Sequence, residues 1–266
     1  MSEEKVNNRI FELDVLRGIS ILLMILHHFI YDLRHVLGLD VFAFQDTDFF
    51  INFVRGVFLC VFVVVSGICC QFSRNNIKRA GKMAIASVIL SLAMLVASLI
   101  SKMDLYIFFN MLYVLTICVF LQGLFDKFYL KKIQKMTTQQ QNVKKTHYNV
   151  FLLVIVVLGL GGELLPHIFE NPNSIVFLPF GFIPENLPGM GDYLPLFPWI
   201  GFFFLGVVIG KNCYTQKKTR FPGIPDSVKK VMTPLVWSGQ NALWVYLFHQ
   251  PVLLGVLFLL RYVKII

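Results

Sequence analysis

The stretch LDVLRGISILLMILHHFI, residues 13–30, decides the fold class of this chain. A helix needs about 20 mostly apolar residues to cross the hydrocarbon core of a bilayer, and this stretch has that length and character. Arg17 and His28 interrupt it. An ionisable side chain in the middle of a membrane-spanning helix costs about 3 kcal/mol on insertion scales, so such residues are functional candidates by default.

The composition extends the membrane interpretation to the whole chain. Hydrophobic residues make up 56% of the 266 residues and charged residues only 15%, against about 25% charged in soluble proteins. Apolar runs recur, so we predict one all-α, polytopic transmembrane helix bundle over residues 1–266 with about seven spans. The expected spans are residues 13–33, 49–71, 82–101, 105–125, 149–168, 194–210 and 238–260.

The basic residues predict the orientation of these spans. Of the 24 Lys and Arg residues, eighteen fall on the side of the N-terminus, four on the other side, and two, Arg17 and Arg55, within spans. The positive-inside rule therefore places the N-terminus in the cytoplasm and, after seven spans, the C-terminus outside. We expect a multi-pass protein of the cell membrane. Membrane topology explains the net charge of +9, so no nucleic-acid partner is expected.

Two loops and the cysteines add further expectations. The basic, Gln-rich segment 126–148 is expected to be a cytoplasmic linker on anionic headgroups. The apolar, Pro-rich segment 171–199 is expected to cover a cavity on the outer face, because irregular backbone at membrane depth must be covered. None of the five cysteines has metal-ligand spacing, so no metal site is expected.

A polar stripe runs along the first predicted helix. Arg17 and His28 are eleven residues apart, which places them on nearly the same face and roughly 16 Å apart along the axis. Asp14 and Asp32 fall on the same face, within an arc of about 60°. His27 points about 100° away from His28, toward headgroups or a neighbouring helix.

His28 is the strongest candidate for chemistry in this stripe. Imidazole transfers protons near neutral pH, and the Asp32 carboxylate, four residues later, could orient the ring and stabilise its charged form. The alternative is a packed histidine that bonds carbonyl groups. Arg17 has two interpretations as well: a clamp for phosphate or carbonyl oxygens at the inner mouth of a cavity, or an ion pair with Asp14.

Four further candidates lie in other spans. Arg55, in the outer half of the second span, could keep His28 neutral or form an ion pair with Asp32 or Asp48. Ser66, beside Gly67, could serve the site or only close helix packing. Asn241 lies at the cytoplasmic entrance of the last span. His249, near mid-membrane, could face the same cavity as His28 or bond a carbonyl.

Several motifs together resemble a known family. LDVLRGISILLMILHHF with the following YDL, RGVFLCVFVVVSGI, DYLPLFPWIGFFFLGVVIGK and GQNALWVYLFHQPVL occur in this order. The order resembles the heparan-alpha-glucosaminide N-acetyltransferase-like family and, more broadly, the transmembrane acyltransferase superfamily, whose members often have Arg, ten residues and then His in the first helix. Arg17 and His28 match that spacing. FFNMLYVL departs from the family pattern, with Asn110 and Tyr113 in place of a glycine and a histidine.

The resemblance implies transfer of an acyl group from cytoplasmic acetyl-CoA to a hydroxyl or amine on the outer side, on a saccharide or lipid-linked acceptor. It implies that His28 is the catalytic histidine and Arg17 its motif partner. Together with Asp32, which could orient His28, these are our three candidate catalytic residues. Arg17, Arg55, Ser66, Asn241 and His249 are our candidates for binding acetyl-CoA. The sequence is compatible with direct transfer and with a covalent acyl-histidine intermediate. The expected partners also include the lipid bilayer and further copies of the chain in an oligomer.

Two other classes of function use the same stripe. A transporter or channel could carry protons or bind an anion through the Arg, His and Asp side chains. A non-catalytic member could serve as a sensor or partner subunit. Binding of CoA, acetyl transfer and solute flux distinguish the three.

Overall fold

The computed structural model describes residues 10–101, 108–133, 138–187, 192–216 and 218–264. The described residues form helices and connecting segments without strands, which confirms the all-α prediction. Six helical segments are long and apolar enough to cross a membrane. The remaining predicted span, the sixth along the chain at residues 194–210, forms the shorter apolar helix α7 (Trp199–Cys213).

The chain forms two compact units. Unit 1 comprises Met1–Val65 and Gln216–Ile266, and unit 2 comprises Ser66–Thr215. Unit 1 holds α1 (Phe11–Tyr31), the start of α2 (Arg55–Ile68), α8 (Asp226–Val231), α9 (Thr233–Gln240) and α10 (Ala242–Tyr262). Unit 2 holds α3 (Asn76–Ser101), α4 (Met111–Ile133), α5 (Thr138–Gly161), α6 (Leu165–Ile168) and α7.

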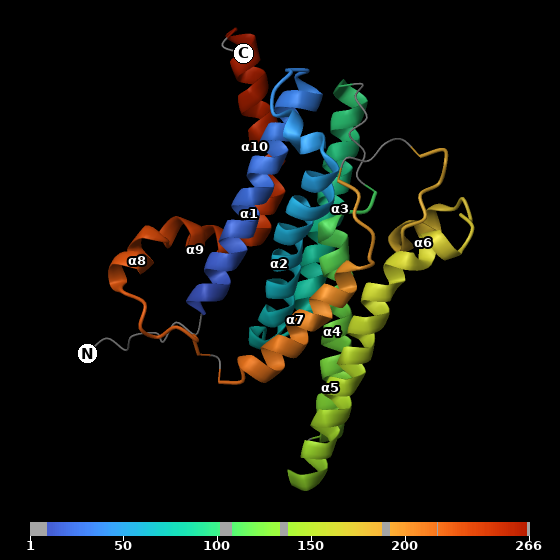
Figure 1. Ribbon diagram of the computed structural model, residues 1–266, viewed down its shortest axis with the longest axis vertical. Coiled ribbons are helices and arrows are strands. Elements are labelled where there is room, and N and C mark those ends of the chain that lie inside the picture. The colour runs from blue at the N-terminus through green and yellow to red at the C-terminus, as the bar shows by residue number, and fades with distance from the viewer. Residues whose placement is uncertain (1–9, 102–107, 134–137, 188–191, 217, 265–266) are drawn as a thin grey trace. The chain divides into compact units, whose positions relative to one another are not determined.

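In unit 1, α1 packs on α9 and on α10 (Figure 1). Two glycines allow the approach to α9. A Cβ atom on Gly18 would collide with the Leu235 carbonyl oxygen, and one on Gly239 would collide with the Asp14 carbonyl oxygen. Small residues at such contacts let helix backbones come close in membranes, so this pair fixes the distance between α1 and α9.

The C-terminal end of α1 changes its winding at Asp32. The helix continues as the π-helix η1 (Asp32–Val36), in which the Leu37 amide donates to the Asp32 carbonyl at 2.9 Å. A second π-helix, η3 (Phe49–Val54), leads into α2, and the 3₁₀-helix η2 (Ala43–Asp46) lies between the two. Single π-turns re-aim side chains and are frequent at functional sites.

In unit 2, α3 packs on α4 and α5 packs on α7. A polar network joins α4, α5 and α7: Lys211 Nζ lies 2.8 Å from Asp126 Oδ1, and the Tyr148 hydroxyl donates to the same oxygen at 3.2 Å. Gln122, which is fully buried, donates to the Tyr148 hydroxyl at 3.3 Å. These contacts give the apolar helices of this unit a fixed register.

The segment 126–148 differs from the predicted linker. Most of this segment is helical, because α4 continues to Ile133 and α5 begins at Thr138. Residues 134–137 lie outside the described part. The Asp126 and Tyr148 contacts explain the difference, since they bind the two helix ends into the core of unit 2. The predicted cover over an outer cavity at 171–199 stays a prediction; this segment contains the 3₁₀-helix η6 (Ile175–Phe180), and residues 188–191 are outside the described part.

Candidate functional site

Two histidines from different helices of unit 1 meet inside the membrane-spanning region. His28 lies near the end of α1 and His249 lies in α10, and their ring centroids are 5.0 Å apart. His249 Nδ1 is 2.6 Å from the Tyr246 carbonyl oxygen. A carbonyl only accepts hydrogen bonds, so Nδ1 carries a proton and donates it, and Nε2 is the basic nitrogen of the neutral ring.

A buried carboxylate lies beside this pair. Asp32 is completely buried, and the Gln250 side-chain amide donates to both of its oxygens, at 2.9 and 3.1 Å. Asp32 is close enough to His28 to interact with it electrostatically. Asp32, His28 and His249 therefore form one acid–base cluster between α1 and α10.

Arg17 lies about three turns before His28 on α1. Its Nη1 donates to the Gly239 carbonyl at 3.4 Å, while Nη2 is buried without a hydrogen-bond partner among the described residues. Asp14, the predicted ion-pair partner, instead accepts a hydrogen bond from Gln240 at 3.1 Å. The guanidinium therefore keeps hydrogen-bonding capacity for an anion or a carbonyl oxygen.

The other candidates do not join this cluster. Arg55 begins α2, and the described residues contain no ion pair between it and Asp32 or Asp48. Asn241 donates to the Trp237 carbonyl at 2.9 Å and lies directly before α10, about two turns before His249. Ser66 belongs to unit 2 and is buried next to Gly67, where a Cβ atom would collide with the Phe203 carbonyl oxygen.

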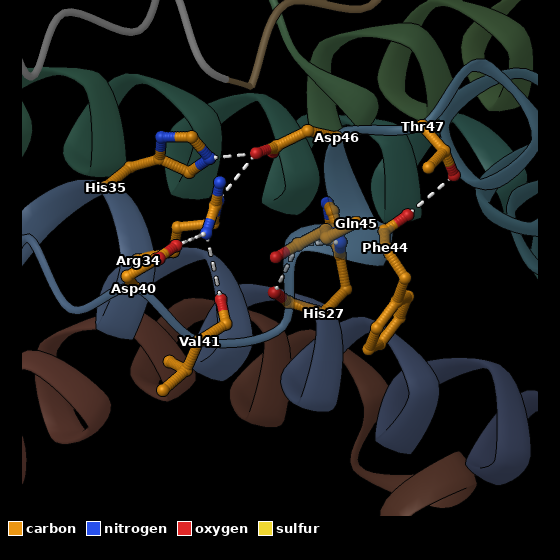
Figure 2. A network of polar contacts seen from close by, with 9 residues as sticks. All are labelled: His27, Arg34, His35, Asp40, Val41, Phe44, Gln45, Asp46 and Thr47. Carbon is orange, nitrogen blue, oxygen red and sulfur yellow. Dashed lines mark hydrogen bonds and ion pairs between the residues drawn. The ribbon is translucent and has the colours of Figure 1, made fainter.

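A second polar cluster at the end of α1 was not predicted from the sequence. Arg34 contacts Asp46 at 2.6 Å and Asp40 at 3.0 Å, and His35 Nε2 donates to Asp46 at 3.0 Å (Figure 2). The Arg34 guanidinium, and after it the His35 imidazole, lower the pKa of the Asp46 carboxyl. These contacts fasten the segment 40–47 over the end of α1. The available signal was the pair of basic residues, Arg34 and His35, followed by Asp40 and Asp46.

His27 is bound by the same segment. The Gln45 side-chain Nε2 lies 2.6 Å from His27 Nδ1 and 3.0 Å from the His27 carbonyl oxygen (Figure 2). Gln45 itself is 3% exposed. His27 thus contacts a loop amide, and its ring lies 5.5 Å from that of His28.

A comparison with protein-family models matches residues 9–251 to heparan-alpha-glucosaminide N-acetyltransferase, catalytic. The chain belongs to this family. The match covers α1 and reaches His249 and Gln250 in α10, so it contains the whole histidine–carboxylate cluster. Searches of curated proteins and of solved structures found no match.

Membership in the heparan-alpha-glucosaminide N-acetyltransferase catalytic family, together with six candidate spans, indicates a multi-pass membrane protein of acetyltransferase type. The departure from the family pattern in α4 has a local structural role. Asn110 is buried, and its Oδ1 accepts from the amides of Leu112 and Tyr113 at 3.1 and 3.4 Å. This is the bonding of a helix N-cap.

Tyr113 also makes a structural contact, because its hydroxyl lies 2.9 Å from Ser91 Oγ on α3. Within the described residues, no group of three or more His, Cys, Asp or Glu side chains could hold a metal ion.

Proposed function

We propose that this protein is a membrane-embedded acetyltransferase. It moves an acetyl group from cytoplasmic acetyl-CoA to a hydroxyl or amine of an extracytoplasmic acceptor, with a saccharide as the acceptor class. Family membership supports the reaction class. The observation that carries the proposal is the cluster in which His28 lies beside His249 and the buried Asp32.

In this proposal His28 is the general base. It takes the proton of the acceptor as the acceptor's oxygen or nitrogen bonds to the acyl carbon, and it returns a proton to sulfur as the carbon–sulfur bond breaks. Asp32 stabilises the charged imidazole between these two steps. Gln250 holds the carboxylate in place through both oxygens.

Arg17 is the proposed anchor for the acyl donor. CoA carries phosphates and a thioester carbonyl, and a guanidinium presents several donors to such oxygens. The unpartnered Nη2 of Arg17 suits this role. The binding roles of Arg55, Ser66, Asn241 and His249 stay predictions.

The test uses labelled acetyl-CoA. Purified protein in liposomes is incubated with labelled acetyl-CoA and a cell-envelope extract, and the labelled product is isolated and identified. We expect His28→Ala to lower the rate of transfer by at least about a hundredfold, because it removes the base. His167→Ala is the matched control, since His167 is exposed on α6. Transfer by His28→Ala at the wild-type rate would exclude the proposed base.

A proton-coupled transporter is the second candidate, because the fully buried Asp32 between α1 and α10 is of the type that proton paths use. CoA distinguishes the two functions. We expect CoA to raise the thermal stability of the wild type and to have a smaller effect on Arg17→Gln. Solute-driven proton flux in liposomes without stabilisation by CoA would favour transport.

A further inference from the structure

The chain that leads into α8 and α9 is fastened to the first turn of α1. Glu12 accepts a hydrogen bond from the Thr219 hydroxyl at 2.6 Å and another from the Arg220 amide at 2.8 Å. Figure 1 shows α8 and α9 extending sideways from the N-terminal half of α1. We call residues 218–237 the α8–α9 segment. Its beginning is held level with the start of a candidate membrane span.

The far end of the α8–α9 segment is held at the same level. Gly239 of α9 lies directly against the carbonyl group of Asp14, which also belongs to the first turn of α1. The next helix, α10, is another candidate span and begins at Ala242. A segment fixed at both ends where two spans begin lies at the border between the hydrocarbon core and the headgroups.

The helix α8 separates apolar from basic side chains. Val228 and Val231 are three residues apart and share one face, whereas Lys229 and Lys230 lie on the opposite face. The valines are 41% and 75% exposed, so they do not belong to the core of unit 1. Both lysines are exposed as well. Amphipathic helices with this division lie in the membrane interface, with the apolar face toward the acyl chains.

The residues on both sides of α8 have the same character. Phe221 and Trp237 are 60% and 61% exposed, and tryptophan is enriched where membrane meets water. Asp226, the one acidic residue of the segment, lies 2.9 Å from Lys229. The segment contains four basic residues, which are Lys218, Arg220, Lys229 and Lys230. Four positive charges and one negative charge leave a net charge of +3 at the level of the headgroup phosphates.

We propose that the α8–α9 segment is a docking surface for anionic lipid headgroups. The lysines reach the lipid phosphates, because long basic side chains extend their charge toward the headgroups while their stems cover apolar surface. The predicted orientation places this surface on the cytoplasmic leaflet, whose anionic lipids attract such segments. The inference goes beyond the proposed function and does not depend on acetyl transfer.

The exposed apolar side chains favour lipid over the phosphates of CoA as the occupant. A soluble polyanion would engage only the basic residues. A bilayer also removes Phe221, Val231 and Trp237 from water, which is favourable. The surface therefore matches a ligand that has negative charge on one side and hydrocarbon on the other.

Hydrogen exchange in nanodiscs tests the proposal. The wild type is compared in phosphatidylcholine alone and in phosphatidylcholine with about 30% phosphatidylglycerol, an anionic lipid. We expect the amides of residues 218–232 to exchange at least about fivefold more slowly with the anionic lipid at low salt. Nanodiscs present the same lipids on both faces, so the result does not depend on orientation. Equal exchange in the two lipid mixtures would overturn the proposal.

Salt and charge variants test the electrostatic part. The slowing should disappear at about 0.5 M NaCl, where the Debye length is only about 4 Å. It should also disappear when three lysines are neutralised together by the substitutions Lys218→Gln, Lys229→Gln and Lys230→Gln. Slowing that persists in this triple variant would overturn the role of the lysines.

The matched control neutralises three exposed basic residues at the start of α3, in unit 2, by the substitutions Arg74→Gln, Lys78→Gln and Lys82→Gln. This variant loses the same amount of charge and should keep the slowing at residues 218–232. Its loss in the control would show a general effect of net charge and overturn the local surface.

Two further measurements identify the occupant. With Trp199→Phe and Trp244→Phe, Trp237 is the single tryptophan, and lipids brominated on the acyl chains should quench its fluorescence. Unquenched fluorescence would overturn the apolar contact. CoA at about 1 mM, a high concentration for an enzyme substrate, should leave exchange at residues 218–232 unchanged in phosphatidylcholine nanodiscs. Slowing by CoA without slowing by phosphatidylglycerol would assign the surface to soluble phosphates and overturn the proposal.

Discussion

At the scale of single residues, the site depends on a carboxylate that is held by one amide. Asp32 is fully buried and receives two hydrogen bonds from Gln250. A buried charge is tolerated only when such bonds satisfy it. Gln250 therefore supports both the stability of the α1–α10 contact and the orientation of the acid–base cluster.

Replacing this amide should be costly. We expect Gln250→Leu to destabilise the protein by about 2 kcal/mol, the value of a hydrogen bond to a charged group, and to lower the thermal unfolding temperature. Asn241→Leu is the control on the same chain segment, since its side chain bonds only to an exposed backbone carbonyl. Equal melting temperatures for the two variants would contradict the supporting role of Gln250.

The lowered pKa of Asp46 predicts how the stability of the segment 40–47 depends on pH. Because Arg34 and His35 lower the pKa of its carboxyl, the contribution of the ionised group is present above its unfolded pKa of about 3.9 and is lost as pH falls through the lower folded pKa. The segment 40–47 should thus keep its amide hydrogen-exchange protection at about pH 5, which lies above both pKa values of Asp46.

The variant Asp46→Asn separates this effect from a general effect of acid. It should lose protection in residues 40–47 at neutral pH, while protection in unit 2 stays unchanged. Hydrogen-exchange mass spectrometry measures both. A wild-type segment that loses protection already near pH 5 would show that the Asp46 contacts do not hold it.

At the scale of elements, glycine positions set the packing of α1. Gly239 has no room for a methyl group beside the Asp14 carbonyl, whereas Gly255 on α10 has open space around its Cβ position. We expect Gly239→Ala to destabilise the protein by about 1 to 3 kcal/mol through overpacking. Gly255→Ala should be neutral or slightly stabilising, because alanine favours helix. Chemical unfolding of the two variants checks this, and a neutral Gly239→Ala would contradict the close approach of α1 and α9.

Element boundaries show what the sequence could predict. Long apolar runs gave the membrane helices, because their length matches the bilayer and their polarity is low. The polar stripe of α1 identified His28 and Asp32, since helical periodicity places them on one face. The prediction of a linker at residues 126–148 was wrong. The Lys and Gln content of this segment indicated a linker, but it gives no information about the contact between Asp126 and Tyr148, which joins its two helices.

The partners across helices could not be predicted in the same way. Gln250 follows His249 in sequence, yet its bond to Asp32 depends on the packing of α10 on α1. Gln45 lies in a short 3₁₀-helix whose return onto α1 depends on the Arg34 and His35 contacts. Periodicity describes one helix at a time, so it contains no information about these pairs.

At the scale of the whole molecule, the side of the membrane on which the C-terminus lies depends on whether α7 crosses it. Its 15 residues are about 22 Å long, which is shorter than the hydrocarbon core of about 30 Å. Six crossings would place both termini on one side, and seven would separate them. The loop before α10, residues 211–233, holds more Lys and Arg residues than the segment after it. This difference favours seven crossings, because the more basic side is cytoplasmic.

We therefore expect a reporter fused after Ile266 to lie outside and one fused before Met1 to lie inside. Alkaline phosphatase and green fluorescent protein fusions measure these positions. Cys213, exposed at the end of α7, should react with a membrane-impermeant thiol reagent only from the cytoplasmic side. A C-terminal reporter that is active only inside would show that α7 does not cross.

The π-turns between Asp32 and Val36 have a consequence for relatives of this protein. Such a turn contains one residue more than an α-turn, so the loss of one residue there would restore regular winding and turn the side chains within it by about 100°. Arg34 and His35 would then leave Asp46. A homologue shorter by a single position in this stretch must fasten its outer segment by different chemistry, so alignments there should be judged by spacing before residue identity.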